Sequence, residues 1–395
     1  MKKATREHTK LHNWRLVLRT IYQEGEISRA DLARVTHLTK TTVSSIVSDL
    51  INEDLVAEVG YGPSIGGKPP MLVAVVDDSR HLIGLDLANS EFRGSVLDLR
   101  GNILHRVKLP VPNQDGRFML SLVYELVDSL MTEVKKPLLG IGIGSPGLMD
   151  APSGIIRQAI NLNWLDLPLR DLLHERYDVP VYLANDSHAA ALGEYSFGPD
   201  RGSNNLIVVK AGRGTSAGIV LNGRLHYGEG SGAGEIGHVR VLGNEKLCPC
   251  GHIGCLETIV SSLALLEQAR VIFANNPQSS LHKFAETAAE INTEKVVLAF
   301  QDGDEAIQDV VEEIGFYLGL AVANFVGVFN IQNIILAGSL ARFGQPLVDV
   351  INREMRCSAM DTLAKETNVY LSNLGEDVVM LGAASLLLSN ELGAV

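Results

Sequence analysis

The chain has 395 residues, 46% of them hydrophobic and 20% charged, which is the composition of a folded protein of two or three domains and excludes a disordered chain. The apolar stretch near residues 318–338 is interrupted by Gly, Asn and Gln, which favours a buried helix and strand over a membrane span. No apolar segment follows the charged N-terminus, so we expect a cytoplasmic protein without a secretory signal.

The net charge of −12 is unevenly distributed along the chain. Residues 1–48 contain nine Lys or Arg and four Asp or Glu, whereas residues 77–395 contain 24 basic and 38 acidic side chains. A basic N-terminal segment on an acidic body indicates nucleic-acid binding confined to that segment, because the acidic body repels phosphate.

The N-terminal segment shows the pattern of three short helices. An apolar face is spaced for a helix at Trp14, Val17, Leu18 and Ile21. Ser28 and Asp31 then form a capping box for a second helix, and Thr39 is a plausible N-cap for a third. Two strand-like runs around a Gly/Pro-rich tip in residues 55–76 predict a β-hairpin.

These elements predict a winged helix-turn-helix over residues 1–76. Small hydroxyl side chains on the third helix suit a major groove, and a lysine at the hairpin tip suits phosphate. The open alternative is a small helical interaction domain with solvated Ser and Thr. The residues expected to contact DNA are Ser28, Arg29, Thr39, Lys40, Thr41, Thr42, Ser44, Ser45, Gly67 and Lys68.

The rest of the chain contains two similar halves. Residues 81–111 read as three strands with tight turns, and residues 204–230 repeat that form. Helices alternate with buried strands after each triplet. We therefore expect two α/β lobes, at residues 77–187 and 188–379, with a cleft between them and a C-terminal helix (about 380–395) packed back on the first lobe.

Three of the four cysteines lie close together in the second half. Cys248, Cys250 and Cys255 follow His238, and three thiolates with one imidazole form a closed tetrahedral site typical of structural Zn²⁺. His252 is a competing ligand, and reduced cysteines without metal are the open alternative. Cys357 stands apart and is expected to be a small buried side chain.

Motifs in the body resemble the ROK family (repressors, open reading frames and kinases): NDSHAAALGE (185–194), GEIGH (234–238) and CPCGHIGCLE (248–257). The resemblance implies an α/β actin/hexokinase-like domain of two lobes that binds a sugar between them. It also implies that His238 binds zinc through one ring nitrogen and faces the sugar with the other. The implied sugar-binding residues are Gly147, Asn161, Asn185, Asp186, Glu235, His238 and Glu257.

In the kinases of this family the aspartate that matches Asp186 is the general base, but phosphoryl transfer also requires Gly-rich loops around ATP. The first such loop, approximately Asp-x-Gly-Gly-Thr, is replaced here by the sequence at 86–90, DLANS. The second, Gly-Thr-Gly-x-Gly, is GRGTS at 212–216, and the third turn is thinned to AGS at 337–339. We therefore expect a retained sugar site, a lost ATP site and no kinase activity.

The sequence thus predicts a sugar-responsive transcriptional repressor. Its expected partners are double-stranded operator DNA and a monosaccharide or sugar derivative as effector, with no membrane. A homodimer or homotetramer would present winged heads to half-sites one helical turn apart or a multiple of it, and sugar is expected to release the DNA. The alternatives are an ATP-dependent sugar kinase with an appended DNA-binding head, and a sugar sensor whose head binds another protein.

Overall fold

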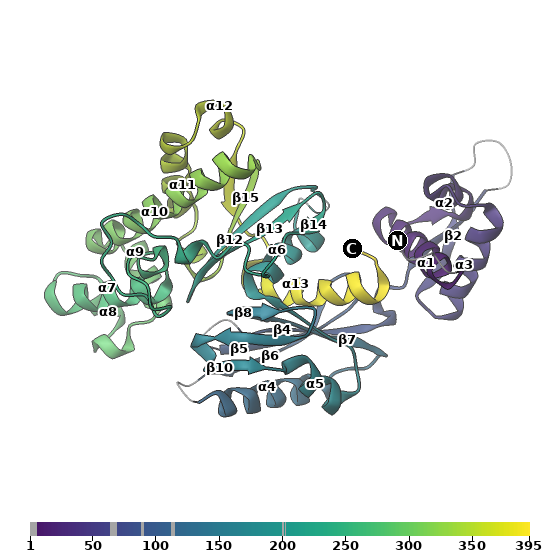
Figure 1. Ribbon diagram of the computed structural model, residues 1–395, viewed down its shortest axis with the longest axis horizontal. Coiled ribbons are helices and arrows are strands. Elements are labelled where there is room, and N and C mark those ends of the chain that lie inside the picture. Colours follow the sequence, from purple (N-terminus) through teal and green to yellow (C-terminus); the bar gives the residue numbers. More distant parts are fainter. Residues whose placement is uncertain (1–5, 64–68, 88–90, 112–114, 200, 202) are drawn as a thin grey trace.

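The computed structural model describes residues 6–63, 69–87, 91–111, 115–199, 201 and 203–395. It consists of a small N-terminal head beside a body of two lobes (Figure 1). The predicted combination of a winged helix-turn-helix with a two-lobed α/β domain is confirmed.

The head has the helices and strands expected of a winged helix-turn-helix. The Ser28 hydroxyl accepts the backbone N–H of Asp31, and the Thr39 hydroxyl accepts that of Thr42, so both predicted N-caps form. The three strands make an antiparallel sheet in the order β1-β3-β2. The elements are α1 (Arg6–Glu24), β1 (Ile27–Ser28), α2 (Arg29–Thr36), α3 (Lys40–Asn52), β2 (Val56–Tyr61) and β3 (Met71–Val75).

The first lobe is built on a five-stranded sheet in the order β11-β7-β4-β5-β6. β5 pairs antiparallel with β4 and β6, whereas β4, β7 and β11 run parallel. A second, antiparallel sheet has the order β10-β9-β8. The elements of this lobe are β4 (His81–Asp86), β5 (Glu91–Leu97), β6 (Ile103–Pro110), α4 (Gly116–Met131), β7 (Leu138–Ser145), β8 (Leu148–Asp150), β9 (Ile155–Ala159), β10 (Trp164–Leu167), α5 (Leu169–Tyr177) and β11 (Val181–Asn185).

The second lobe repeats this sheet topology, with the order β14-β13-β12-β15-β16. Its β13 pairs antiparallel with β12 and β14, and β12, β15 and β16 run parallel, so the strand triplets recognised in the sequence are equivalent. Its elements are β12 (Leu206–Ala211), β13 (Thr215–Leu221), β14 (Arg224–Leu225), α7 (Ser262–Asn275), α8 (Leu281–Phe284), α9 (Thr293–Gln301), α10 (Glu305–Phe329), β15 (Asn333–Ala337), α11 (Gln345–Ser358), α12 (Asp361–Ala364) and β16 (Asn368–Leu371).

Within the described residues, α10 is the one helix long and apolar enough to cross a membrane. One such helix is weak grounds for a span, because the core helix of a folded domain has the same composition. Ile314, Leu318 and Val322 of α10 lie in the main core of the second lobe, together with β12 and β15 residues. Packing inside the protein therefore accounts for the apolar length of α10.

Two helices, α6 (Asp186–Phe197) and α13 (Val378–Leu387), cross between the two lobes (Figure 1). At the crossing, a Cβ on Gly382 would lie 1.6 Å from the Ala189 carbonyl oxygen, so only glycine allows the backbones to approach this closely. α13 rests in the same way on the first-lobe sheet, where a Cβ on Gly142 would lie 1.9 Å from the Ala383 oxygen. α13 therefore packs on the first-lobe sheet as well as on α6.

The segment after α13 joins the body to the head. This π-helical turn, η8 (Leu388–Leu392), lies beside α1, where Arg19 donates a hydrogen bond of 2.9 Å to the Gly393 carbonyl. Tyr22 of α1 donates to the Leu99 carbonyl at 2.7 Å and lies under the Arg100 guanidinium. Apolar side chains of the head and of the first lobe form a single buried cluster across this joint.

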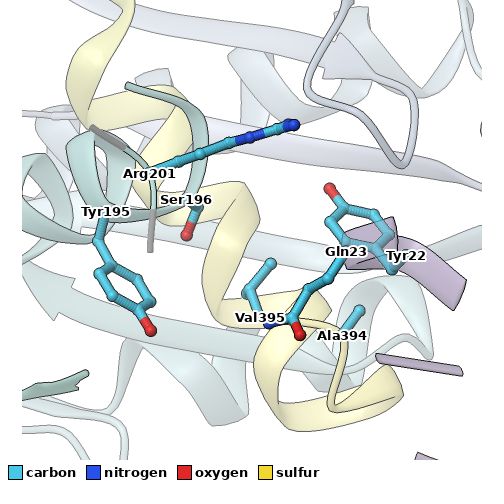
Figure 2. Close-up of a pocket in the computed structure, with 7 residues that line it drawn as sticks. All are labelled: Tyr22, Gln23, Tyr195, Ser196, Arg201, Ala394 and Val395. Carbon is cyan, nitrogen blue, oxygen red and sulfur yellow. The ribbon is translucent and has the colours of Figure 1, made fainter. Parts of the chain in front are cut away.

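A hollow of about 270 Å³ remains at the joint. Figure 2 shows Tyr22 and Gln23 of α1 across it from Tyr195 and Ser196 of α6. The head is thus packed against the body, but with unfilled space between α1 and the end of α6.

We expect Gly382→Ala to destabilise the protein, because the new methyl group cannot fit against the Ala189 carbonyl without separating α6 from α13. Overpacking of this kind costs about 1–3 kcal/mol or more. Gly327→Ala is the matched control, since Gly327 lies in α10 and a Cβ there would meet nothing within 4 Å. Denaturant unfolding followed by circular dichroism measures both, and equal midpoints would contradict the role given to this crossing.

Candidate functional site

The predicted metal ligands lie together in one loop of the second lobe. Cys248 Sγ is 3.7 Å from His238 Nδ1, and Cys250 Sγ is 3.6 Å from Cys255 Sγ. All four ligand atoms lie within 4.8 Å of one another. Isolated β-bridges, one from Arg240 to Cys255, fold the loop back on itself and create this arrangement.

This donor set fits a tetrahedral cation. Four ligands about 2.3 Å from a central zinc are about 3.8 Å apart, close to the 3.7 Å between Cys248 and His238 and the 3.6 Å between Cys250 and Cys255. Burial raises the pKa of Cys248 and Cys255, whereas at Cys250 burial is outweighed by hydrogen bonds from His252 and the other two thiols, which lower its pKa to about 6. A divalent cation binds the thiolate form, so metal binding would release protons from this cluster. His252 lies outside the four-residue group, with Nδ1 3.7 Å from Cys250 Sγ. The expectation that Cys357 is buried is wrong: it is exposed on α11.

Residues predicted for the sugar come first from the carboxyl end of β11. Asn185 caps α6 by accepting the backbone N–H of Ser187 at 2.9 Å and donates through Nδ2 to the Gly147 carbonyl at 3.1 Å. Asp186 follows as the first residue of α6. Gly147 has φ 94°, and a Cβ there would lie 2.1 Å from the Gln158 carbonyl, which explains the glycine.

The remaining predicted acids come from loops of the second lobe. Glu257 accepts the backbone N–H of Thr215 at 2.8 Å. Burial, followed by the charges of Asp186 and Glu257, raises the pKa of Glu235, while His238 lowers it. A Cβ on Gly237 would lie 3.4 Å from the Glu257 Cβ, and His188 of α6 bonds to the Ala233 carbonyl, so the segments that carry Asp186, Glu235 and Glu257 meet.

His238 connects this polar site to the metal cluster. Its Nδ1 faces Cys248, and its Nε2 lies 4.0 Å from Glu235 Oε2. One ring nitrogen can therefore bind a cation while the other is directed toward the acids, as the family resemblance implies.

One residue predicted to bind the sugar, Asn161, has no described contact with the others. Asn161 is exposed in the short turn η2 (Ile160–Leu162), and its sugar contact stays a prediction. The hollow at the head and a second one beside Asp115 and Trp164 are lined by none of the residues predicted for the sugar.

Two residues of this site were missed by the sequence analysis. Lys210 of β12 forms a buried ion pair with Asp186, with 2.7 Å between Nζ and Oδ2. His188 bonds through Nε2 to the Ala233 carbonyl at 2.9 Å and so holds the loop that leads to Glu235. Burial lowers the pKa of His188, so its imidazole is neutral and donates to that carbonyl. A lysine inside the apolar run LIVVKA was a visible signal for the first.

The turns that would hold ATP phosphates in a kinase are partly described. The second, at residues 212–214, joins β12 to β13, and the Gly212 carbonyl accepts the backbone N–H of Ser262. In the third, Gly338 has φ 92° and precedes Ser339, whose hydroxyl is buried without a partner among the described residues. The first loop includes residues 88–90, which lie outside the described residues.

The predicted DNA-contacting surface is exposed on α3 and its N-cap. The residues that share this exposed face are Thr39, Lys40, Thr41, Ser44 and Ser45, with Thr42 half-buried beside them. Arg29 pairs with Glu58 of β2 at 2.9 Å and is partly exposed. The expectation that Ser28 contacts DNA is corrected here: Ser28 is 2% exposed and its hydroxyl caps α2, so it cannot reach DNA. Gly67 and Lys68 lie outside the described residues.

Comparison with known proteins agrees with this arrangement. The ROK family profile matches residues 82–390, and the MarR family profile matches residues 11–60. The xylose repressor of Caldicellulosiruptor bescii is 30% identical over 381 residues, which cover 95% of each chain. The glucokinase of Halalkalibacterium halodurans is 30% identical over 317 residues, covering 79% of this chain and 96% of its own.

Among solved structures, a ROK family transcriptional regulator described as a homologue of the Escherichia coli MLC protein superposes with a TM-score of 0.83. It is 27% identical, and 98% of each chain is covered. Both the body and the head therefore have counterparts in the same order. The chain belongs to the ROK family and carries a MarR-type winged helix-turn-helix at its N-terminus.

Proposed function

We propose that this protein is a sugar-responsive DNA-binding repressor of carbohydrate-utilisation genes. The observation that carries the proposal is the extent of the matches: a xylose repressor and a ROK transcriptional regulator match the chain from head to body, whereas a glucokinase matches 79% of it. Such a regulator requires a DNA-binding domain joined to a domain that binds the sugar, and this chain combines a winged helix-turn-helix with a polar site suited to a sugar. We place the protein in the cytoplasm, where DNA and sugar are both available.

The polar residues of the site suit a monosaccharide. Carboxylates accept hydrogen bonds from neighbouring hydroxyl groups, and Asp186, Glu235 and Glu257 are carried by segments that meet at this site. Asn185 and His238 add donors and acceptors at its edge. In this proposal the sugar binds these groups from both lobes, with Asn161 as a further contact.

Sugar binding would reach the head through α6 and α13. α6 begins at Asp186 and ends near Tyr22 of α1, and α13 crosses it before continuing into the turn that holds α1. A change in lobe closure would alter the position of the head and so the spacing of two heads in a homodimer or homotetramer. Coupling of about 1–3 kcal/mol between sugar and DNA is typical of such regulators. We propose that the sugar releases the operator.

A sugar kinase with an appended head is the second candidate, and the retained Asp186 is the observation that favours it. Against it stand the ion pair between Lys210 and Asp186 and the absence of the family's glycines from the first phosphate loop in the sequence. We propose that the protein is not an enzyme.

The four-residue cluster would hold a structural Zn²⁺. His238, Cys248, Cys250 and Cys255 supply a complete tetrahedral set, which leaves no position for substrate. The cation would fix the loop between Glu235 and Glu257, and so the distance between two acids of the sugar site.

We expect a monosaccharide to weaken DNA binding by a factor of about 5–150. Duplexes selected from a random pool by the full chain would serve as the operator, and fluorescence anisotropy would follow binding with D-xylose, D-glucose or N-acetyl-D-glucosamine. The proposal fails if none of these sugars, nor their phosphates, changes DNA affinity. ATP-dependent phosphorylation of a sugar in a coupled assay would establish the kinase instead.

We expect Lys40→Gln to weaken operator binding and to reduce the slope of log affinity against log salt concentration by about one, because one phosphate contact is lost. Lys365→Gln, an exposed lysine of the second lobe, is the control and should leave the slope unchanged. Anisotropy titrations at several salt concentrations give both slopes. Equal slopes in the two variants would place the DNA surface elsewhere.

We expect Cys250→Ser to remove the zinc and to lower the melting temperature, because a site that loses one thiolate binds the cation more weakly. Cys357→Ser is the control, since this exposed cysteine lies outside the cluster. Elemental analysis should give one zinc per chain for wild type and for the control. Wild-type protein purified without a stoichiometric metal would overturn the assignment.

A further inference from the structure

Lys210 occupies an unusual position in the second lobe. It lies in β12, the central strand of the five-stranded sheet, and all six residues of that strand are buried. Its side chain is 5% exposed. Since removing a charged ammonium from water is costly, a lysine persists at such a position only where a counter-ion stabilises it.

The counter-ion is Asp186, 2.7 Å away and 10% exposed. Burial lowers the pKa of Lys210, but the charges of Asp186 and Asp86 raise it and prevail, while Arg93 opposes them. The side chain is therefore a protonated ammonium, paired with Asp186 and further stabilised by the charge of Asp86.

The pair joins parts that are far apart in the topology. Asp186 follows the last strand of the first-lobe sheet, and Lys210 lies near the carboxyl end of the central strand of the second. Their ion pair links the two sheets through the carboxylate that the sugar is proposed to contact. A movement that separates the two sheets at this point would break the ion pair.

We propose that Lys210 is a positioning residue of the sugar site. Its ammonium holds Asp186 by Oδ2, which fixes the direction of the other oxygen and leaves that oxygen to accept a sugar hydroxyl. Because Oδ2 is occupied by the ammonium, Asp186 serves the sugar as a hydrogen-bond acceptor through its other oxygen. This inference rests on the proposed function and assigns to that site a residue outside the motifs.

The proposal predicts separate effects on folding and on sugar affinity. Lys210→Met leaves the Asp186 carboxylate buried without its partner and should lower the melting temperature by on the order of 10 °C. It should also weaken sugar binding at least tenfold. Lys210→Arg keeps a cation and should retain more of the affinity than Lys210→Met does. Lys283→Met is the control: its 2.6 Å pair with Asp302 is solvent-exposed, so little change is expected.

The double variant Asp186→Asn/Lys210→Met separates positioning from simple stabilisation. With both charges removed, the melting temperature should recover above that of Lys210→Met, while sugar affinity stays low because the carboxylate is gone. The full chain is titrated by calorimetry with D-xylose, D-glucose or N-acetyl-D-glucosamine, whichever most raises the wild-type melting temperature. If Lys210→Met does not fold, Lys210→Gln, which keeps a hydrogen-bond donor but no charge, supplies the same comparison with Lys210→Arg.

Sugar affinity of Lys210→Met within twofold of wild type would overturn the proposal, as would a Lys210→Arg variant that binds no better than Lys210→Met. Loss of affinity in Asp186→Asn together with unchanged affinity in Lys210→Met would reject the role of Lys210 and leave the proposed function intact. A wild type that bound none of the sugars would reject the proposed function, and the assignment of Lys210 with it.

Discussion

The close crossing of α6 and α13 is the contact on which the rest of the molecule depends. Gly382 and Gly193 remove the side chains that would hold the two backbones apart. α6 also lies against β13 of the second lobe, where a Cβ on Gly218 would be 2.2 Å from the Ser187 oxygen. One pair of helices therefore connects both sheets, and its two ends lie at the polar site and at the head. Because packed backbones have little freedom to deform, a displacement at one end has to be taken up as a movement of whole elements.

The two ends of the α6–α13 pair differ in the charge of their surroundings. Near the start of α6, Asp186 lies beside the buried ammonium of Lys210. This ion pair offsets the free-energy cost of burying the Asp186 carboxylate. Near the end of α6, the contacts to the head are mainly apolar, supplemented by hydrogen bonds from arginine to backbone carbonyls. A polar ligand can thus bind at the charged end of α6. The position of the head at the other end is fixed by apolar packing.

Much of this organisation follows from local sequence patterns. The N-caps Ser28 and Thr39, the two strand triplets and the cysteine cluster depend on residues near one another in the chain, and the structure contains each of them. The ion pair between Lys210 and Asp186 depends on two sheets meeting, which no local pattern encodes. The same holds for the burial of Ser28 and the exposure of Cys357, since both are decided by what packs above a residue.

The buried cluster that runs from α1 into the first lobe has a consequence for engineering. Leu387, Leu388 and Leu392, from the opposite end of the sequence, complete the apolar core of the head. The head is therefore not an interchangeable module at the level of packing. A chimera that grafts the head onto another body would have to carry residues 387–395 as well, or the transplanted head would expose the surface that those leucines cover.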